Sequence, residues 1–388
     1  MALLVLVPAC GFEAPTMTNH DDAGGGDGGG GSDSSVHDAR AVDAMPDAPT
    51  LCFGTYPTVC FTSVADVPVT PLTLMEDIDT MASVLCNAHH NAQSTDYCVI
   101  AAAGLTVPTG TTIRAYGAKP LVLLSTTTLE LSGNLDVSSS SASGVQHPTG
   151  AGVVAIGACT TGVVAPESSG GGSGGSFGGS GGNGQKADSN KTPKAGPAAT
   201  SFPPVLRAGC PGSAGSLPVP ATDSGKPGDG GGAVSVIAAV VHLDGQINAS
   251  GAAGIAGAAS KVGGGGGGSG GMIVIDSPSI MPGTSFALFA NGGGGGQGGA
   301  GPGGQNAGAG KNGSESTGPA TPAAGGNNLS TAGGIGGSGS AGTGSKDGVP
   351  GGTGNLPGNA GGGGGGGGAG FIRAHGITTS ISPPSTDP

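Results

Sequence analysis

Large aromatic side chains are almost absent from this sequence of 388 residues. It has no tryptophan, 3% aromatic residues and 9% charged residues, whereas 88 residues are glycine. Glycine loses more backbone freedom on folding than any other residue, and few large side chains are left to fill a core. This composition disfavours a compact body of packed helices. The apolar residues lie in short clusters of Val, Ile, Leu and Ala, which favours thin, repetitive β structure.

Positive charge is also scarce, with 12 Lys and Arg against 24 Asp and Glu. Much of the acidity lies in one short segment near the N-terminus, and no Lys or Arg stripe occurs anywhere. A nucleic-acid partner is therefore disfavoured, because such partners require clustered positive charge. The acidic residues of that segment are Asp21, Asp22, Asp27, Asp33, Asp38, Asp43 and Asp47.

The N-terminal sequence MALLVLVPACGFEAP contains an apolar run at 3–7 that is too short to span a bilayer. The letters VPAC, ending at Cys10, resemble a bacterial lipobox, in which the Cys becomes the lipidated first residue. We therefore expect a signal peptide at 1–9 and attachment to a membrane through a lipid on Cys10. Gly11 resembles the second residue of lipoproteins sorted to the outer membrane, so the expected location is the outer membrane or cell surface, or otherwise secretion. Residues 10–50 are rich in Gly, Ser and Asp and are predicted to form a disordered tether.

The remaining cysteines are six, an even number that predicts disulfides in an exported chain. Their spacing favours Cys52 with Cys60, Cys86 with Cys98, and Cys159 with Cys210, although six cysteines allow fifteen connectivities. Zinc binding is the rival interpretation, but no CxxC pair occurs, and no metal site or cofactor is predicted. Residues 51–98 are predicted to form a small Cys-containing cap region.

Two pairs of segments repeat a strand pattern. LELSGNLDV (129–137) and VHLDGQINA (241–249) alternate apolar and polar residues around a central glycine, which predicts a half-buried strand with a bend. VPTGTTIRA (107–115) and MPGTSFALFA (281–290) each place a Pro and Gly turn before a strand. Short strands separated by turns, with no helical segment of consequence, indicate a solenoid of stacked coils.

The stretch CVIAAAGLTVPTGTTIRAYGAKPLVLLSTTTLELSGNLDVSS resembles the opening coils of a right-handed parallel β-helix of the pectin-lyase-like class. With the lipobox, the tether and the glycine runs, the whole chain resembles the glycine-rich secreted lipoproteins common in myxobacteria. The resemblance implies an all-β fold, a right-handed parallel β-helix at 99–388 with long Gly-rich inserts, and a surface location. It carries no catalytic motif.

Four glycine blocks, at 168–184, 263–271, 292–310 and 325–370, are predicted to be insertions that leave one edge of the solenoid. One interpretation is flexible decoration, since isolated Gly-rich chains are flexible coils. The other is that successive runs pack side by side as extended threefold helices, because backbones without Cβ atoms can approach closely enough to hydrogen-bond.

Strand alternation points four chemically useful side chains outward, namely Glu130, Asp136, His242 and Asp244. Two carboxylates held about 5–10 Å apart could act as acid and base on a glycosidic bond. The leading hypothesis is a non-enzymatic structural or adhesive surface lipoprotein, with extracellular polysaccharide or matrix as its partner. The alternatives are a polysaccharide lyase or hydrolase on the same scaffold, and a matrix or ice-binding surface built from packed polyglycine helices.

Overall fold

Strands and extended segments dominate the structure, and the only helix among the described residues is a short 3-10 turn, η1 (Val64–Asp66). The computed structural model describes residues 51–86, 97–142, 145–146, 148–153, 159, 169–187, 193–215, 225–259, 261–302, 306–342, 345–355 and 359–384. Cys10 and the predicted signal peptide and tether lie outside the described residues. The described residues belong to one compact unit, residues 49–388.

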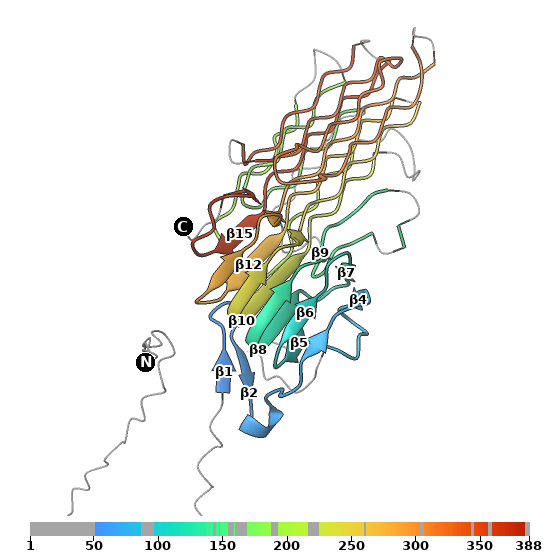
Figure 1. Cartoon of the computed structure of the whole chain (residues 1–388). Coiled ribbons are helices and arrows are strands. Elements are labelled where there is room, and N and C mark those ends of the chain that lie inside the picture. Colours follow the sequence, from blue (N-terminus) through green and yellow to red (C-terminus); the bar gives the residue numbers. More distant parts are fainter. Residues whose placement is uncertain are drawn as a thin grey trace, which may run out of the picture. The chain divides into compact units, whose positions relative to one another are not determined.

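Two sheets with parallel strand pairing form the apolar part of this unit (Figure 1). The first sheet contains β3 (Leu72–Thr73), β5 (Cys98–Ala102), β6 (Leu105–Val107), β8 (Leu121–Leu131), β10 (Ala233–Leu243), β12 (Met272–Asp276), β13 (Ile280–Pro282) and β15 (Phe371–Ala374). The second contains β4 (Ile78–Asp79), β7 (Thr112–Tyr116), β9 (Asn134–Asp136), β11 (Gln246–Asn248), β14 (Ala287–Phe289) and β16 (Ile381–Ser382). An antiparallel hairpin, β1 (Leu51–Phe53) and β2 (Val59–Phe61), is separate from both.

The chain passes back and forth between the two sheets, so strands distant in sequence become neighbours. β8 pairs in parallel with β10, with Leu129 opposite Val241 and Leu131 opposite Leu243. These inward side chains are buried, as alternation along the strands predicts. The larger core therefore lies between the sheets, and a second apolar cluster covers the other face of the first sheet.

The central glycine of the repeated template lies where the chain leaves one sheet for the other. Gly133 separates β8 from β9, and Gly245 separates β10 from β11. A Cβ on Gly245 would lie closer than 3.0 Å to the carbonyl oxygen of Gly133, so the two corners stack with no room for a side chain. The predicted bend is confirmed, and it divides each predicted strand into two.

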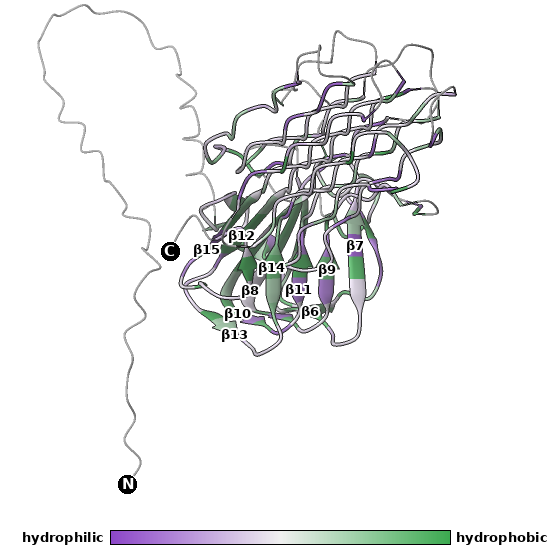
Figure 2. Ribbon diagram, turned by 90° about the horizontal axis from the view of Figure 1, so that it is seen from above, coloured by the Kyte–Doolittle hydropathy of each residue, from purple (hydrophilic) through white to green (hydrophobic). Residues whose placement is uncertain are grey.

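Three long insertions leave the same edge, each between a second-sheet strand and the next first-sheet strand. They occupy 137–232, 249–271 and 290–370, and their described parts are called the glycine bundle below. Figures 1 and 2 show them as extended segments running side by side beyond the strands.

Segment 263–271 shows how the bundle is held together. Its amides at 264, 267 and 270 donate to the carbonyls of 362, 365 and 368, with N···O distances of 2.9–3.0 Å. Its other amides and carbonyls form hydrogen bonds to five further segments. These bonds also recur every three residues, as in an extended threefold helix. The six neighbours are 172–175, 210–213, 228–231, 249–255, 293–296 and 362–368. The glycine runs are thus packed and hydrogen-bonded, as the second interpretation of the sequence predicts.

Close packing of backbones explains the unbroken glycine runs at the centre. A Cβ on Gly267 or Gly364 would lie closer than 3.0 Å to a backbone carbonyl of the neighbouring segment. At the rim of the bundle, non-glycine residues occur at intervals of three, as at Ile335 and Ser338, which are separated by two glycines.

The all-β class with parallel sheets is confirmed. The described strands form two sheets rather than a closed solenoid, and a large share of the body is glycine bundle without strands. The glycine segments lie outside the sheets because they have no side chains to place in a hydrophobic core. They are held instead by backbone hydrogen bonds.

Candidate functional site

Two of the predicted catalytic residues lie side by side. Glu130 on β8 is opposite His242 on the adjacent strand β10, both directed away from the core between the sheets. Glu130 is exposed and His242 is half-buried. Asp244, two residues beyond His242, is also exposed, so three of the four candidates share one region of the first sheet and the corner that follows it.

The fourth candidate, Asp136, is occupied by a structural interaction. Its carboxylate forms an ion pair with the Arg114 guanidinium at 2.7 Å, and that guanidinium also donates to the Ser138 carbonyl at 3.0 Å. Arg114 lies opposite Asp136 on the neighbouring strand of the second sheet. The geometry therefore separates Asp136 from the other candidates and gives it a role in joining β7 to β9.

All six predicted cysteines are paired in disulfides. The pairs are Cys52–Cys60, Cys86–Cys98 and Cys159–Cys210, the same three that the spacing favours.

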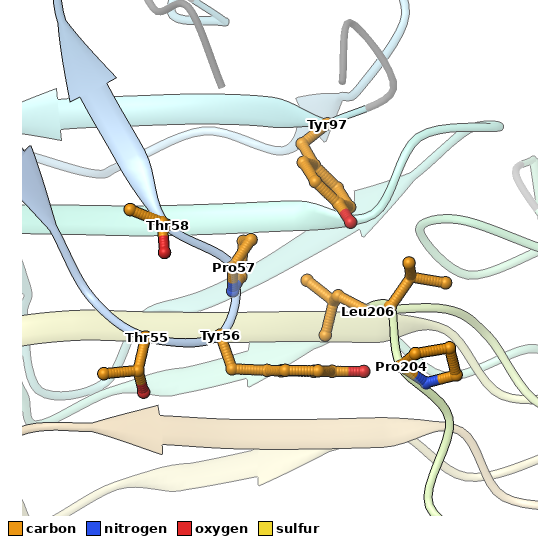
Figure 3. A pocket seen from close by; sticks show the side chains of 8 residues that line it. Thr55, Tyr56, Pro57, Thr58, Tyr97, Pro204 and Leu206 are labelled. Atoms are coloured by element: carbon orange, nitrogen blue, oxygen red, sulfur yellow. The ribbon is translucent and has the colours of Figure 1, made fainter. Parts of the chain in front are cut away.

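A pocket that the sequence did not indicate lies between the β1–β2 turn and a proline-rich loop (Figure 3). Its volume is about 260 Å³. Figure 3 shows the Tyr56 side chain extending from the turn toward Pro204, with Tyr97 reaching in from a separate segment. The lining residues are Thr55, Tyr56, Pro57, Thr58, Tyr97, Pro204, Val205 and Leu206.

The Asp276 carboxylate at the end of β12 fixes the turn that forms one wall. One of its oxygens accepts hydrogen bonds from the Thr55 amide, from the Thr55 hydroxyl at 2.8 Å and from the Tyr56 amide at 3.3 Å. The Tyr56 hydroxyl donates to the Pro203 carbonyl at 2.6 Å, which ties this wall to the opposite loop. Burial, reinforced by the nearby Tyr97, raises the pKa of Tyr56 well above its usual value, so the hydroxyl stays protonated as a donor.

A chain of aromatic rings continues behind the pocket toward the glycine bundle. The Phe202 ring lies 5.3 Å from the ring of Tyr56 and 5.3 Å from that of Phe371. Phe371 in turn makes an edge contact with Phe177 at 4.8 Å. These four rings belong to an apolar cluster on the outer face of the first sheet, where they stabilise the loop at 202–206.

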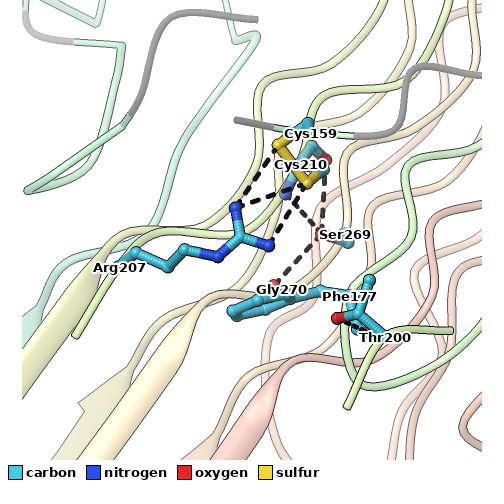
Figure 4. Close-up of a disulfide and its surroundings, with 7 residues drawn as sticks. All are labelled: Cys159, Phe177, Thr200, Arg207, Cys210, Ser269 and Gly270. Atoms are coloured by element: carbon cyan, nitrogen blue, oxygen red, sulfur yellow. Dashed lines mark hydrogen bonds between the residues drawn. A yellow bond between two sulfur atoms is a disulfide. The ribbon is translucent and has the colours of Figure 1, made fainter. Parts of the chain in front are cut away.

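Arg207 links this cluster to a disulfide (Figure 4). Its guanidinium carbon lies 4.5 Å from the centre of the Phe177 ring, and Nη1 lies 3.8 Å from Cys159 Sγ. Burial lowers the pKa of Arg207, yet the group stays charged because arginine titrates far above neutral pH. The cation–π contact helps to hold the chain between the pocket loop and Cys210.

Sequence reasoning missed the pocket because its lining residues come from three distant segments with no shared motif. The available signal was indirect: two of the three tyrosines and a Pro-Pro pair each lie near a cysteine. Proximity in sequence to a cysteine says nothing about which segments meet, so only the tertiary structure brings them together.

The described part of the chain lacks both a candidate membrane-spanning helix and a cluster of metal-ligating side chains. None of its helices is long and apolar enough to cross a membrane, and its His, Cys, Asp and Glu residues form no group of three suited to a metal ion. Comparison with known proteins finds no relative: no family model matches this chain, and neither a curated protein nor a solved structure matches it.

Proposed function

We propose that this chain is a non-enzymatic structural or adhesive lipoprotein of the outer membrane or cell surface, anchored by a lipid on Cys10. The glycine bundle is the observation that carries this proposal. Its central segments bond to six neighbours each, so the inserts form a body held by backbone hydrogen bonds. Such a body suits a surface protein that must keep its shape while presenting loops and pockets to its surroundings.

We also propose that the two stacked sheets are the long sides of a right-handed parallel β-helix. The alternation of the chain between the sheets and the parallel register of β8 with β10 support this arrangement. The right hand follows from the strong preference of parallel crossover connections.

Cell fractionation tests the anchor. Cys10→Ser should release the protein from the membrane fraction, because the lipid supplies the apolar attachment. A matched control, Cys52→Ser with Cys60→Ser, removes two cysteines without touching Cys10 and should stay with the membrane. Membrane retention of Cys10→Ser, or six free thiols in cytoplasmic protein, would refute the proposal. Adhesion is tested by binding of the full-length protein to immobilised polysaccharides.

A polysaccharide lyase or hydrolase is a second candidate, favoured by Glu130 and His242 lying opposite each other on adjacent strands. If the purified protein degrades a polysaccharide, Glu130→Gln and Asp244→Asn should each reduce the rate by about 10²-fold or more, since each removes a potential acid or base without changing shape. Asp136→Asn is the contrasting variant, because its carboxylate is paired with Arg114. Unchanged turnover in Glu130→Gln and Asp244→Asn would eliminate this candidate.

A matrix or ice-binding surface is a third candidate, favoured by the regular rim of the glycine bundle. Ile335 and Val349 on adjoining rim segments are each 49% exposed, which is high for apolar residues. Thermal hysteresis measured on the purified protein tests ice binding. If Ile335→Lys abolishes the hysteresis, the rim binds ice; no hysteresis in the unaltered protein would remove this candidate.

A further inference from the structure

The pocket beside Tyr56 is lined by three segments, and a different disulfide holds each one. Cys52–Cys60 closes the loop that contains the turn at 55–58. Tyr97 directly precedes Cys98, which is bonded to Cys86. The loop at 204–206 lies just before Cys210, which is bonded to Cys159. All three covalent cross-links of the described chain therefore converge on one pocket.

Non-covalent contacts fix the same walls. The Asp276 carboxylate holds Thr55 and the Tyr56 amide, and the Tyr56 hydroxyl bonds across to Pro203. A pocket held in this way is formed before a ligand arrives, so little binding energy is lost in ordering it. The pocket residues Tyr56, Tyr97 and Leu206 also belong to a second apolar cluster, apart from the core between the two sheets, and this cluster supports the pocket from behind.

The described residues of the lining supply apolar and hydroxyl groups and include no charged side chain. Two tyrosines, two prolines, Val205 and Leu206 supply the apolar and aromatic surface, and Thr55 and Thr58 supply hydroxyls. Thr58 is half-buried and lines the pocket, and its hydroxyl makes no hydrogen bond to another described residue. The matching ligand is neutral, presents C–H faces to aromatic rings, and carries hydroxyls at its edges.

We propose that this pocket binds one neutral pyranose ring of an extracellular polysaccharide. Its volume of about 260 Å³ is slightly below the range of sites for drug-sized molecules, and suits a single ring. An acidic sugar would require a cationic side chain in contact with it, and the described residues that line the pocket include none. A proline-rich peptide would require an extended aromatic groove rather than a one-ring pocket. The inference rests on the adhesive function proposed above and names its ligand class.

Tyrosine fluorescence gives a direct readout, because the chain has three tyrosines and no tryptophan, and two of the tyrosines line the pocket. The full-length protein is titrated with the methyl glycosides of glucose, galactose, mannose and N-acetylglucosamine, and with a proline-rich peptide. We expect one glycoside to change the fluorescence with a Kd on the order of 1 mM, the range for one small ring.

Two pocket variants and two matched controls locate the binding. Thr58→Val is nearly isosteric and should weaken binding about two- to tenfold by removing one hydrogen bond. Tyr97→Leu should weaken it about threefold or more by removing an aromatic face. Thr321→Val, on the exposed rim of the bundle, and Tyr116→Leu, on β7, should leave the Kd unchanged. Calorimetry replaces fluorescence for the tyrosine variants, and if Tyr97→Leu fails to fold, Thr58→Val decides alone.

Failure of this inference is distinguishable from failure of the proposed function. If the protein adheres to polysaccharide but no glycoside binds, or if binding survives both pocket variants, the pocket assignment is wrong and adhesion stands. If the peptide binds in place of every glycoside, the pocket is a peptide site and the inference is overturned. If a glycoside binds in the pocket but the protein adheres to no polysaccharide, the adhesive function fails and the pocket assignment stands.

Discussion

Gly267→Ala tests whether the glycine bundle is held by close contact between backbones. The added Cβ would lie closer than 3.0 Å to the Gly293 carbonyl oxygen, so the two segments would have to separate. Three hydrogen bonds of 2.8–2.9 Å are then weakened: Gly267 to Gly365, Gly175 to Gly267, and Gly367 to Gly293. At about 0.5–1.5 kcal/mol each, their loss lowers the free energy of unfolding by about 1.5–4.5 kcal/mol.

A thermal melt followed by circular dichroism measures this change. For a body of this length an unfolding entropy of about 2.1 cal/mol/K per residue converts each kcal/mol into roughly 1.4 °C, so Tm should fall by about 2–6 °C. Gly318→Ala is the matched control, because its Cβ would meet nothing within 4 Å. The control should be neutral or slightly stabilising, since alanine reduces the entropy of the unfolded chain. Equal Tm values for the two variants would refute the packed bundle.

Three further predictions concern the core, a half-buried acid and a cross-link. Leu243→Asp places an unpaired charge between the sheets and should lower the free energy of unfolding by about 3–5 kcal/mol. His242→Asp lies on the opposite face of the strand and should lower it by only about a few tenths of a kcal/mol. Equal Tm values for the two variants in thermal melts would refute the strand assignment. Burial raises the pKa of Asp229 in the folded protein above its pKa in the unfolded chain. The folded state therefore loses stability as the pH rises from the unfolded-state pKa through the folded-state pKa. Asp229→Asn should therefore raise Tm at neutral pH and not at about pH 2, and a gain that is independent of pH would contradict this reasoning. Replacing Cys159 and Cys210 by alanine removes a cross-link with a sequence separation of 51 and should lower the free energy of unfolding by about 4 kcal/mol. An unchanged midpoint in denaturant unfolding would contradict this prediction.

The strands were predictable wherever apolar and polar residues alternate. Leu129 and Leu131 face the core while Glu130 is exposed, as the period of two requires. The disulfides of the N-terminal region were predictable for a related reason, because neighbouring cysteines such as Cys52 and Cys60 need only a short turn to meet. Alternation does not reveal which strands pair, so the position of Glu130 beside His242 came only from the register of β8 with β10.

The sequence by itself determined three properties of this protein: short β-strands with alternating apolar and polar residues, an even number of cysteines after Cys10, and glycine runs without side chains. Those properties are local, since they follow from side-chain size, period and spacing. The tertiary structure alone decided that each central glycine segment has six neighbours, because hydrogen bonds between distant segments depend on where the strands place the ends of each insertion. It alone also decided that Tyr56, Tyr97 and the 204–206 loop enclose one pocket, because three segments far apart in sequence meet only after the sheets have stacked.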